Sequence, residues 1–154
     1  MDDKTLIETL SRDMVRQVAP EELSMFDELM AEYHKDPSPP DLEAQPDDDA
    51  LGFGLGEVLT AVTPAAGAIS GLLVTFAIEV LKQSLADESA DHLRDHIKRM
   101  LGILPRTPQT PRPDSESLRG LHHATMQEAL RFGLTEDEAR RLADAAVARF
   151  AIGA

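Results

Sequence analysis

The chain has 154 residues and a net charge of −13, which argues against nucleic-acid binding, because affinity for phosphates comes mostly from Lys and Arg. Aromatic residues make up 4 % and Trp is absent, so a core must be built from Leu, Ile, Val, Met and Ala, which favours helices packed on helices. Cysteine is absent too, which excludes disulfides, thiolate nucleophiles and cysteine-bound metals from these residues.

The first predicted unit, residues 1–34, is a helical hairpin. Pro20 separates its halves and can open the second helix, because a first-turn proline lacks only an N–H that has no partner there. The N-terminus is acidic where a signal peptide is basic and then apolar, so we expect a cytoplasmic or cytoplasmic-membrane-associated protein. An acidic, Pro-rich linker follows over 35–50. The apolar residues at helical spacing are Leu6, Ile7, Leu10, Met14, Val18, Leu23, Phe26, Leu29, Met30 and Tyr33.

An apolar unit comes next, over residues 51–104. Within it, Thr63 and Pro64 predict an N-cap and a first helical position. This division gives a short helix over 51–62 and a long helix over 64–101. A glycine and a proline just beyond the long helix predict its end.

Residues 58–78 carry no charge, and this run of 21 matches the roughly 20 residues that a helix needs to cross a bilayer. It contains a Gly-x-x-x-Gly motif, which lets two helix backbones approach closely. Basic residues follow the run and acidic ones precede it, so a spanning helix would keep its C-terminal side in the cytoplasm. The residues expected to mediate self-association or membrane contact are Gly67, Gly71, Ile69, Leu72, Leu73, Val74 and Phe76.

Other features of the run suit a soluble protein equally well. It is rich in Ala, Gly and Thr, no Trp or Tyr flanks it, and small residues also permit tight packing of soluble helices. Two interpretations therefore stay open. Either residues 51–78 insert in or sit on a membrane, as an anchor or a lesion-forming effector, or they are buried between subunits of a soluble oligomeric adaptor or structural protein. A break at Thr63–Pro64 also fits a segment that is soluble in one state and inserted in another.

Residues 105–114 predict a semi-rigid spacer. Prolines stand at every third position, which lines them along one edge of a polyproline II helix. A ligand for a proline-recognition domain is the functional alternative.

The last unit, residues 115–154, predicts a second helical hairpin. Asp114 or Ser115 caps its first helix, and Thr135 with Glu138 forms a capping box for its second. The acidic first turn of the second helix argues against a DNA-reading helix-turn-helix, whose recognition helix needs donors for bases and phosphates. The apolar residues assigned to the inner faces are Leu118, Leu121, Met126, Leu130 and Phe132, then Ala139, Leu142, Ala146 and Phe150.

Residues with catalytic or metal-binding chemistry are few. His92 and His96 are spaced as two ligands on one helix face would be, but the residues between them lack the Glu of an HExxH zinc site, and a solvated, salt-bridged face explains the pair as well. No serine stands in a G-x-S-x-G elbow and no P-loop is present. We therefore expect a non-enzymatic protein without metal or cofactor. Its expected partners are a second copy of the chain, a membrane, and a protein bound by the terminal hairpins, with no nucleic acid.

Three stretches, VAPEEL, LGFG followed by VTP, and LTEDEARRLADAAV, resemble small uncharacterised helical proteins of actinobacteria. The resemblance touches most of the chain in scattered pieces. It implies a bacterial origin and a modular helical build. No activity is attached to these proteins, so the resemblance carries over no functional residue.

Overall fold

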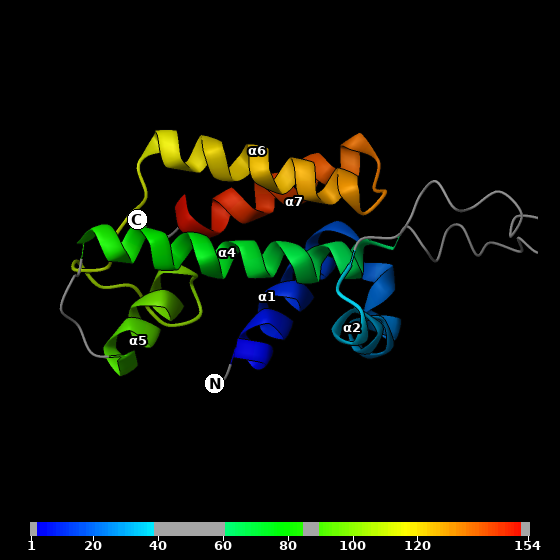
Figure 1. The fold of residues 1–154 in the computed structure, drawn as a ribbon, viewed down its shortest axis with the longest axis horizontal. Coiled ribbons are helices and arrows are strands. Elements are labelled where there is room, and N and C mark those ends of the chain that lie inside the picture. The colour runs from blue at the N-terminus through cyan, green and yellow to red at the C-terminus, as the bar shows by residue number, and fades with distance from the viewer. Residues whose placement is uncertain (1–2, 39–60, 85–89, 152–154) are drawn as a thin grey trace, which may run out of the picture.

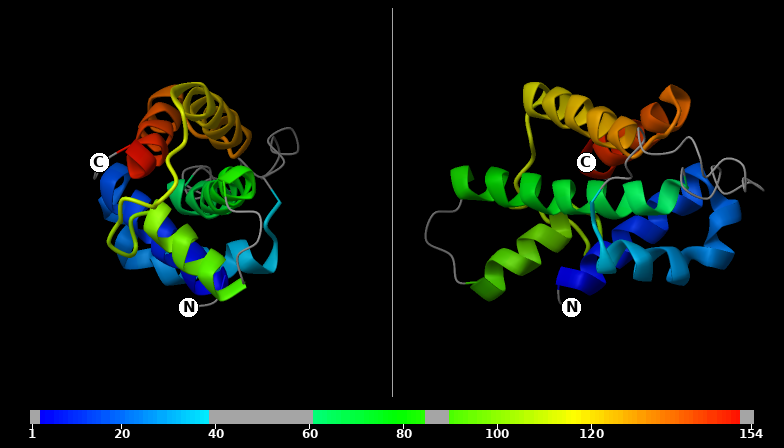
Figure 2. Two further views of the ribbon diagram at one scale, coloured as in Figure 1. Left: turned by 90° about the vertical axis from the view of Figure 1, so that its left-hand side faces the viewer. Right: turned by 45° about the vertical axis from the view of Figure 1, so that its right-hand side comes forward.

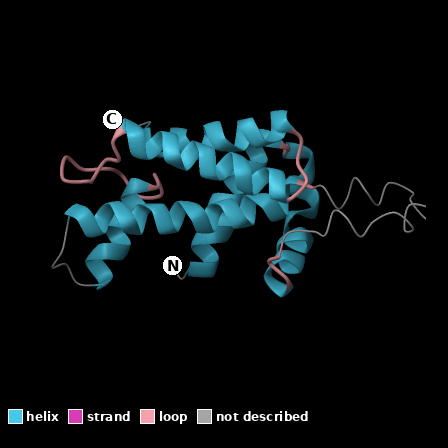
Figure 3. Cartoon of the chain, turned by 45° about the horizontal axis from the view of Figure 1, so that its top comes forward, coloured by secondary structure: helices cyan, strands magenta, loops and turns pink. Residues whose placement is uncertain are grey.

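The computed structural model of the chain describes residues 3–38, 61–84 and 90–151. Helices joined by loops make up these residues, which contain no strand, and this confirms the all-α prediction (Figure 3). The predicted linker over 35–50 and the predicted helix over 51–62 lie largely outside the described residues. The helices are α1 (Asp3–Val18), the 3₁₀ helix η1 (Pro20–Met25), α2 (Phe26–Lys35), α4 (Val62–Ser84), α5 (Ala90–Met100), α6 (Ser115–Arg131) and α7 (Glu136–Ala151).

Helix α4 lies at the centre of the bundle. It contacts α1, α2, α5, α6 and α7, which are all the other described α-helices. The ribbon shows α6 and α7 on one side of α4 and α1, α2 and α5 on the other (Figure 1), and the view along the bundle agrees (Figure 2). Among the described helices, the most apolar one is therefore also the most enclosed one, as expected when the hydrophobic effect drives helix packing.

The packing of α1 on α4 is the most extensive contact that α4 makes. One polar pair lies in it: the hydroxyls of Ser11 and Ser70 are 2.9 Å apart and both side chains are fully buried. Ser70 donates its proton to the carbonyl of Ala66, so Ser11 donates to Ser70, because each hydroxyl has a single proton. The buried apolar residues of α1 are Leu6, Leu10, Met14 and Val15.

The first hairpin differs from its prediction in one detail. Pro20 opens the second half, as expected, but it begins a 3₁₀ helix over Pro20–Met25, and the α-helix starts at Phe26. The 3₁₀ segment brings Glu22 toward the start of α4, where its carboxylate accepts a hydrogen bond from the N–H of Val62. A short 3₁₀ stretch at a helix N-terminus is a common connection of this kind.

The prediction of one long helix over 64–101 is wrong. Helix α4 ends at Ser84 and α5 begins at Ala90. In a continuous helix Met100 would stand about 28 Å further along the axis than Leu81, at about 1.5 Å per residue. Instead α5 packs against α4, and Leu81 and Met100 share one core. Burial of the apolar side of α5 is the physical reason for the break, and Gly102 ends α5 with a φ of +78°.

The second hairpin forms as predicted. Asp114 caps α6, its carboxylate accepting a 2.7 Å hydrogen bond from the backbone N–H of Ser117. In the capping box, the N–H of Thr135 donates to the Glu138 carboxylate at 3.0 Å and the N–H of Glu138 donates to the Thr135 hydroxyl at 3.1 Å. Gly133, with a φ of +86°, makes the turn between the helices.

One part of the predicted inner face of α6 is wrong. Leu130 is 42 % exposed, whereas Thr125 and Ala129 are fully buried. Helix α6 packs closely on α7, and small residues at the contact allow that approach. On α7, the predicted face is confirmed: Ala139, Leu142, Ala146 and Phe150 are all buried.

The segment between α5 and α6 differs from a straight spacer. The chain turns at Thr107–Thr110, where the N–H of Thr110 donates to the Thr107 carbonyl at 3.0 Å and the Thr107 N–H donates to the Thr110 hydroxyl at 2.9 Å. Thr110 is 8 % exposed. Hydrogen bonding by threonine thus overrides the extended preference of the surrounding prolines.

Candidate functional site

Within the described residues, one helix is long and apolar enough to cross a membrane by length and composition alone, over Val62–Gln83. Of its most apolar stretch, 44 % is buried inside the protein. The core helix of a soluble bundle has the same length and composition, so the contacts of this helix carry more information than its hydropathy.

Three of the predicted contact residues, Gly67, Ile69 and Leu73, are buried within this single chain. A Cβ at Gly67 would lie 2.9 Å from Cδ2 and Cε2 of Tyr33, so the glycine accommodates the tyrosine ring of α2. The approach that the Gly-x-x-x-Gly motif allows is thus used at Gly67 by α2 of the same chain. Burial, and then the negative charge of Glu128, raises the pKa of Tyr33.

The remaining four predicted residues lie on partly exposed faces of α4. A Cβ at Gly71 would meet nothing within 4 Å. Leu72 and Val74 are half-buried. Phe76 is half-buried as well, and its ring packs edge-on against Phe150 of α7, with 5.0 Å between centroids and an angle of 69°. The structure therefore does not gather the seven residues onto one exposed face.

The N-terminus of α4 is capped by a residue that sequence reasoning missed. The Glu22 carboxylate accepts hydrogen bonds from the N–H groups of Val62 and Thr63, both at 2.8 Å, and from the Thr63 hydroxyl at 2.7 Å. The predicted N-cap role of Thr63 is therefore wrong, because the helix already begins at Val62. A carboxylate at this end also interacts favourably with the helix dipole.

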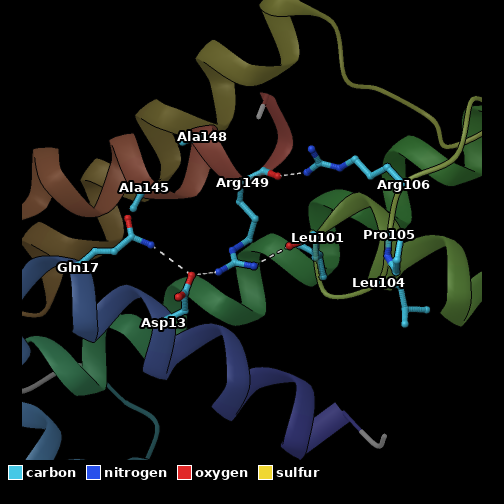
Figure 4. Close-up of a pocket in the computed structure, with 10 residues that line it drawn as sticks. Asp13, Gln17, Leu101, Leu104, Pro105, Arg106, Ala145, Ala148 and Arg149 are labelled. Atoms are coloured by element: carbon cyan, nitrogen blue, oxygen red, sulfur yellow. Dashed lines mark hydrogen bonds and ion pairs between the residues drawn. The ribbon is translucent and has the colours of Figure 1, made fainter. Parts of the chain in front are cut away.

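A second candidate site is a cavity of about 460 Å³ between α1, α7 and the connection that follows α5 (Figure 4). Arg149 of α7 lies on its wall, with a side chain that is 14 % exposed. The guanidinium donates to the carbonyl of Leu101 at 2.6 Å and forms an ion pair with Asp13 of α1. Gln17 donates to the same Asp13 oxygen at 3.2 Å.

Arg106 also lines this cavity, and its partners are main-chain carbonyls. It donates to the carbonyls of Arg99 and Met100, both at 3.1 Å, and to the carbonyl of Arg149. These carbonyls lie at the C-terminal ends of α5 and α7, where helix groups lack internal partners. Gly102 lies between the two guanidiniums: a Cβ there would stand 3.8 Å from Arg106 and 4.0 Å from Arg149.

The two arginines differ in the charges around them. Burial, and then the charges of Arg112 and Arg149, lowers the pKa of Arg106. Burial lowers the pKa of Arg149, and the charge of Asp13 opposes that change. Both side chains stay charged at neutral pH, because the ordinary pKa of arginine lies far above neutral.

The cavity was not predicted, although part of its signal is visible in the sequence. Arg149 falls between Ala146 and Phe150 on the inner face of its helix, and a charged residue at such a position needs a partner. Arg106 follows a helix end by a few residues, where basic side chains reach terminal carbonyls. The identity of the partner, Asp13, depends on the docking of α1 on α7.

The two candidate metal ligands lie on α5. His92 is exposed, and Nδ1 of His96 is buried without a hydrogen bond from the described residues. In the part of the chain that the structure describes, no group of three or more His, Asp or Glu side chains is arranged to hold a metal ion.

The chain was compared with protein-family models, with curated proteins and with solved structures, and none of them matches.

Proposed function

We propose that this chain is a non-enzymatic helical protein that keeps α4 covered in a soluble state and associates with a membrane when α4 is released. One observation carries the proposal. The helix with the length and composition of a membrane span is the central helix of the bundle, and all the other described α-helices contact it.

The surface and the covering helices support this two-state mechanism. Among the described residues, the large apolar side chains that are exposed are Met25 and Leu130, so the compact state offers little for a bilayer to bind. The covering helix α1 has apolar residues on one side and charged residues on the other, so it can also lie at a membrane interface. Release of α4 would therefore expose the apolar side chains of α4 and the apolar side of α1, which are covered in the compact state.

A second candidate function, a soluble adaptor or structural subunit, is favoured by the close fit of Tyr33 on Gly67. That fit joins α2 to α4 tightly within one chain. In this case α4 stays in the core at all times, and the terminal hairpins bind the protein partner.

A reversible disulfide between α1 and α4 tests the proposal. The hydroxyls of Ser11 and Ser70 are 2.9 Å apart, and sulfurs at these positions would lie closer still, because C–S bonds are longer than C–O bonds. The chain contains no other cysteine, so Ser11→Cys with Ser70→Cys can form one disulfide only. We would measure flotation and dye release with vesicles of phosphatidylcholine and phosphatidylglycerol, at neutral and mildly acidic pH.

The proposal expects the unmodified chain and the reduced double variant to float with the vesicles, and the oxidised variant to stay in solution until it is reduced. Each single cysteine variant is a control for the substitution itself. Equal flotation of the oxidised and reduced forms would show that α4 need not leave α1. If the unmodified chain never floats and runs as a defined soluble species, the adaptor function takes the place of the membrane function.

A further inference from the structure

We propose that the cavity between α1, α7 and the α5–α6 connection binds a small organic anion, whose carboxylate or phosphate group pairs with Arg106. The apolar part of the ligand would lie against the aliphatic side of the cavity. The binding site does not depend on the membrane function proposed above, although its effect on α4 does.

The size and lining of the cavity fit such a ligand. Its volume of about 460 Å³ falls in the range of small-molecule sites, about 300–1,000 Å³. Leu104, Pro105 and Ala148 contribute apolar surface, Arg106 and Arg149 contribute positive charge, and Asp13 contributes a carboxylate that is paired with Arg149. A largely apolar wall with a few convergent polar groups is the usual composition of a ligand pocket.

The positive charge of Arg106 favours an anionic ligand. Arg149 has a carboxylate partner in Asp13, but no carboxylate of the described residues forms an ion pair with Arg106. The three carbonyls that it contacts hold the guanidinium in place, yet they carry only partial charges. The positive charge of Arg112 also contributes, after burial, to lowering the pKa of Arg106.

The guanidinium of Arg106 is also preorganised. Its Nε and Nη2 atoms donate to the ends of α5 and α7, and none of the bonds described above uses Nη1. The two N–H groups of Nη1 can therefore meet an oxyanion without giving up an existing bond. An arginine held in one conformation loses little entropy when it binds a carboxylate or phosphate.

An anion bound to Arg106 would strengthen the link between the end of α5 and α7, two elements that contact α4. A ligand that binds the compact state stabilises that state by mass action. If the proposed membrane function holds, the ligand would oppose release of α4 and reduce dye leakage.

The test is a calorimetric titration of the full chain, without vesicles, with benzoate, phenyl phosphate and neutral benzyl alcohol. The proposal expects one or both anions to bind and the alcohol to bind at least about tenfold more weakly, the order expected when a charge-assisted interaction is lost. The tighter of the two anions identifies the group, carboxylate or phosphate. Because no membrane is present, this result is independent of the flotation experiment.

Three variants locate the site. Arg106→Met removes the charge, and Ala148→Leu fills the cavity with a residue that favours helix without changing the charge. Each should weaken anion binding by about tenfold or more. Arg140→Met removes an exposed arginine from α7 outside the cavity and should leave binding unchanged. Thermal melts establish that each variant is folded, and if Arg106→Met is not, Ala148→Leu and the neutral alcohol decide.

Three results would overturn the proposal. The first is that neither anion binds at millimolar concentration. The second is that the alcohol binds as tightly as benzoate, which would make the cavity a purely apolar site. The third is that Ala148→Leu binds as well as the unmodified chain, which would place the anion elsewhere.

Discussion

At the scale of single residues, the two glycines of the Gly-x-x-x-Gly motif have different surroundings. A Cβ at Gly67 would meet the Tyr33 ring at 2.9 Å, and it would also lie 3.3 Å from Cγ of that ring. The whole ring would have to move, because Cγ is the ring atom bonded to Cβ and cannot shift without the rest of the ring. Gly71 has open space around it, so a substitution there would affect stability only through the flexibility of the backbone.

We predict that Gly67→Ala lowers the free energy of unfolding by about 1–3 kcal/mol, the usual effect of overpacking. Gly71→Ala should raise it by about 0.5–1 kcal/mol, because alanine is the better helix former. Urea unfolding followed by far-UV circular dichroism measures both. In a Tyr33→Ala background the effect of Gly67→Ala should shrink. Equal losses at the two glycines would instead point to a helix pair that uses both.

Asp114 provides a prediction of pH dependence. The backbone hydrogen bond from Ser117, and then that residue's side chain, lowers the pKa of Asp114 from its ordinary value of 3.8. A carboxylate with a lowered folded pKa contributes stability above its unfolded pKa, and that contribution is lost as the pH falls through the folded pKa. Asp114→Asn keeps an acceptor at the N-cap but removes the charge.

The unmodified chain should therefore be more stable than Asp114→Asn near neutral pH. The difference should shrink as the pH drops below 3.8 and vanish below the folded pKa. Urea unfolding at a series of pH values measures it. A difference that stays constant down to strongly acidic pH would mean that the charge of Asp114 has no part in capping α6.

At the scale of helices, the position of α4 depends on a group from outside it. Its first N–H groups, on Val62 and Thr63, find their acceptor in Glu22 of η1. The first turn of an isolated helix has no internal acceptors for these groups. The 3₁₀ helix thus both connects α1 to α2 and holds the start of the central helix.

We predict that Glu22→Gln lowers the free energy of unfolding by about 1–3 kcal/mol, because a neutral amide oxygen replaces a carboxylate that accepts three hydrogen bonds. Glu21→Gln, at an exposed neighbouring position, is the matched control and should change stability by less than about 0.5 kcal/mol. The comparison uses urea unfolding of both variants at one pH. Equal effects would mean that Glu22 acts only through the net charge.

At the scale of the whole molecule, the described helices share one core rather than forming separate modules. Residues from every described α-helix belong to a single buried cluster. The two terminal hairpins therefore dock on α4, on its opposite sides (Figure 2). The buried residues that represent α1, α2, α4, α5, α6 and α7 are Leu10, Phe26, Ile69, Met100, Leu121 and Phe150.

We predict that the chain unfolds in one cooperative transition. Tyr33 is its only tyrosine and Trp is absent, so tyrosine fluorescence reports the α2–α4 contact alone, while far-UV circular dichroism reports all helices. The two signals should change at the same urea concentration, as in a two-state protein. If the tyrosine signal changed first, the N-terminal hairpin would separate from α4 before the rest unfolds.

Local patterns in the sequence account for the helices that were predicted correctly. The three- and four-residue spacing located both hairpins, and the Asp114 cap and the Thr135–Glu138 box were recognisable because their partners lie three residues apart. The break before α5 was missed, because the hydrophobic pattern continues on both sides of it. Only the advantage of folding α5 back onto the core explains that break.

By itself, the sequence determined the fold class, most helix positions, the caps of α6 and α7 and the presence of one helix with the composition of a membrane span. The tertiary structure decided which groups bind the free N–H groups of that helix and which groups pack around it. Glu22 accepts hydrogen bonds at its start, Tyr33 packs on Gly67, and the Arg149–Asp13 ion pair joins two of the helices that cover it. The physical reason is the sequence separation between the interacting residues. Helix signals act over three or four residues, whereas Glu22 and Val62 are 40 residues apart and Asp13 and Arg149 are 136 apart, so their contacts exist only once the helices have docked.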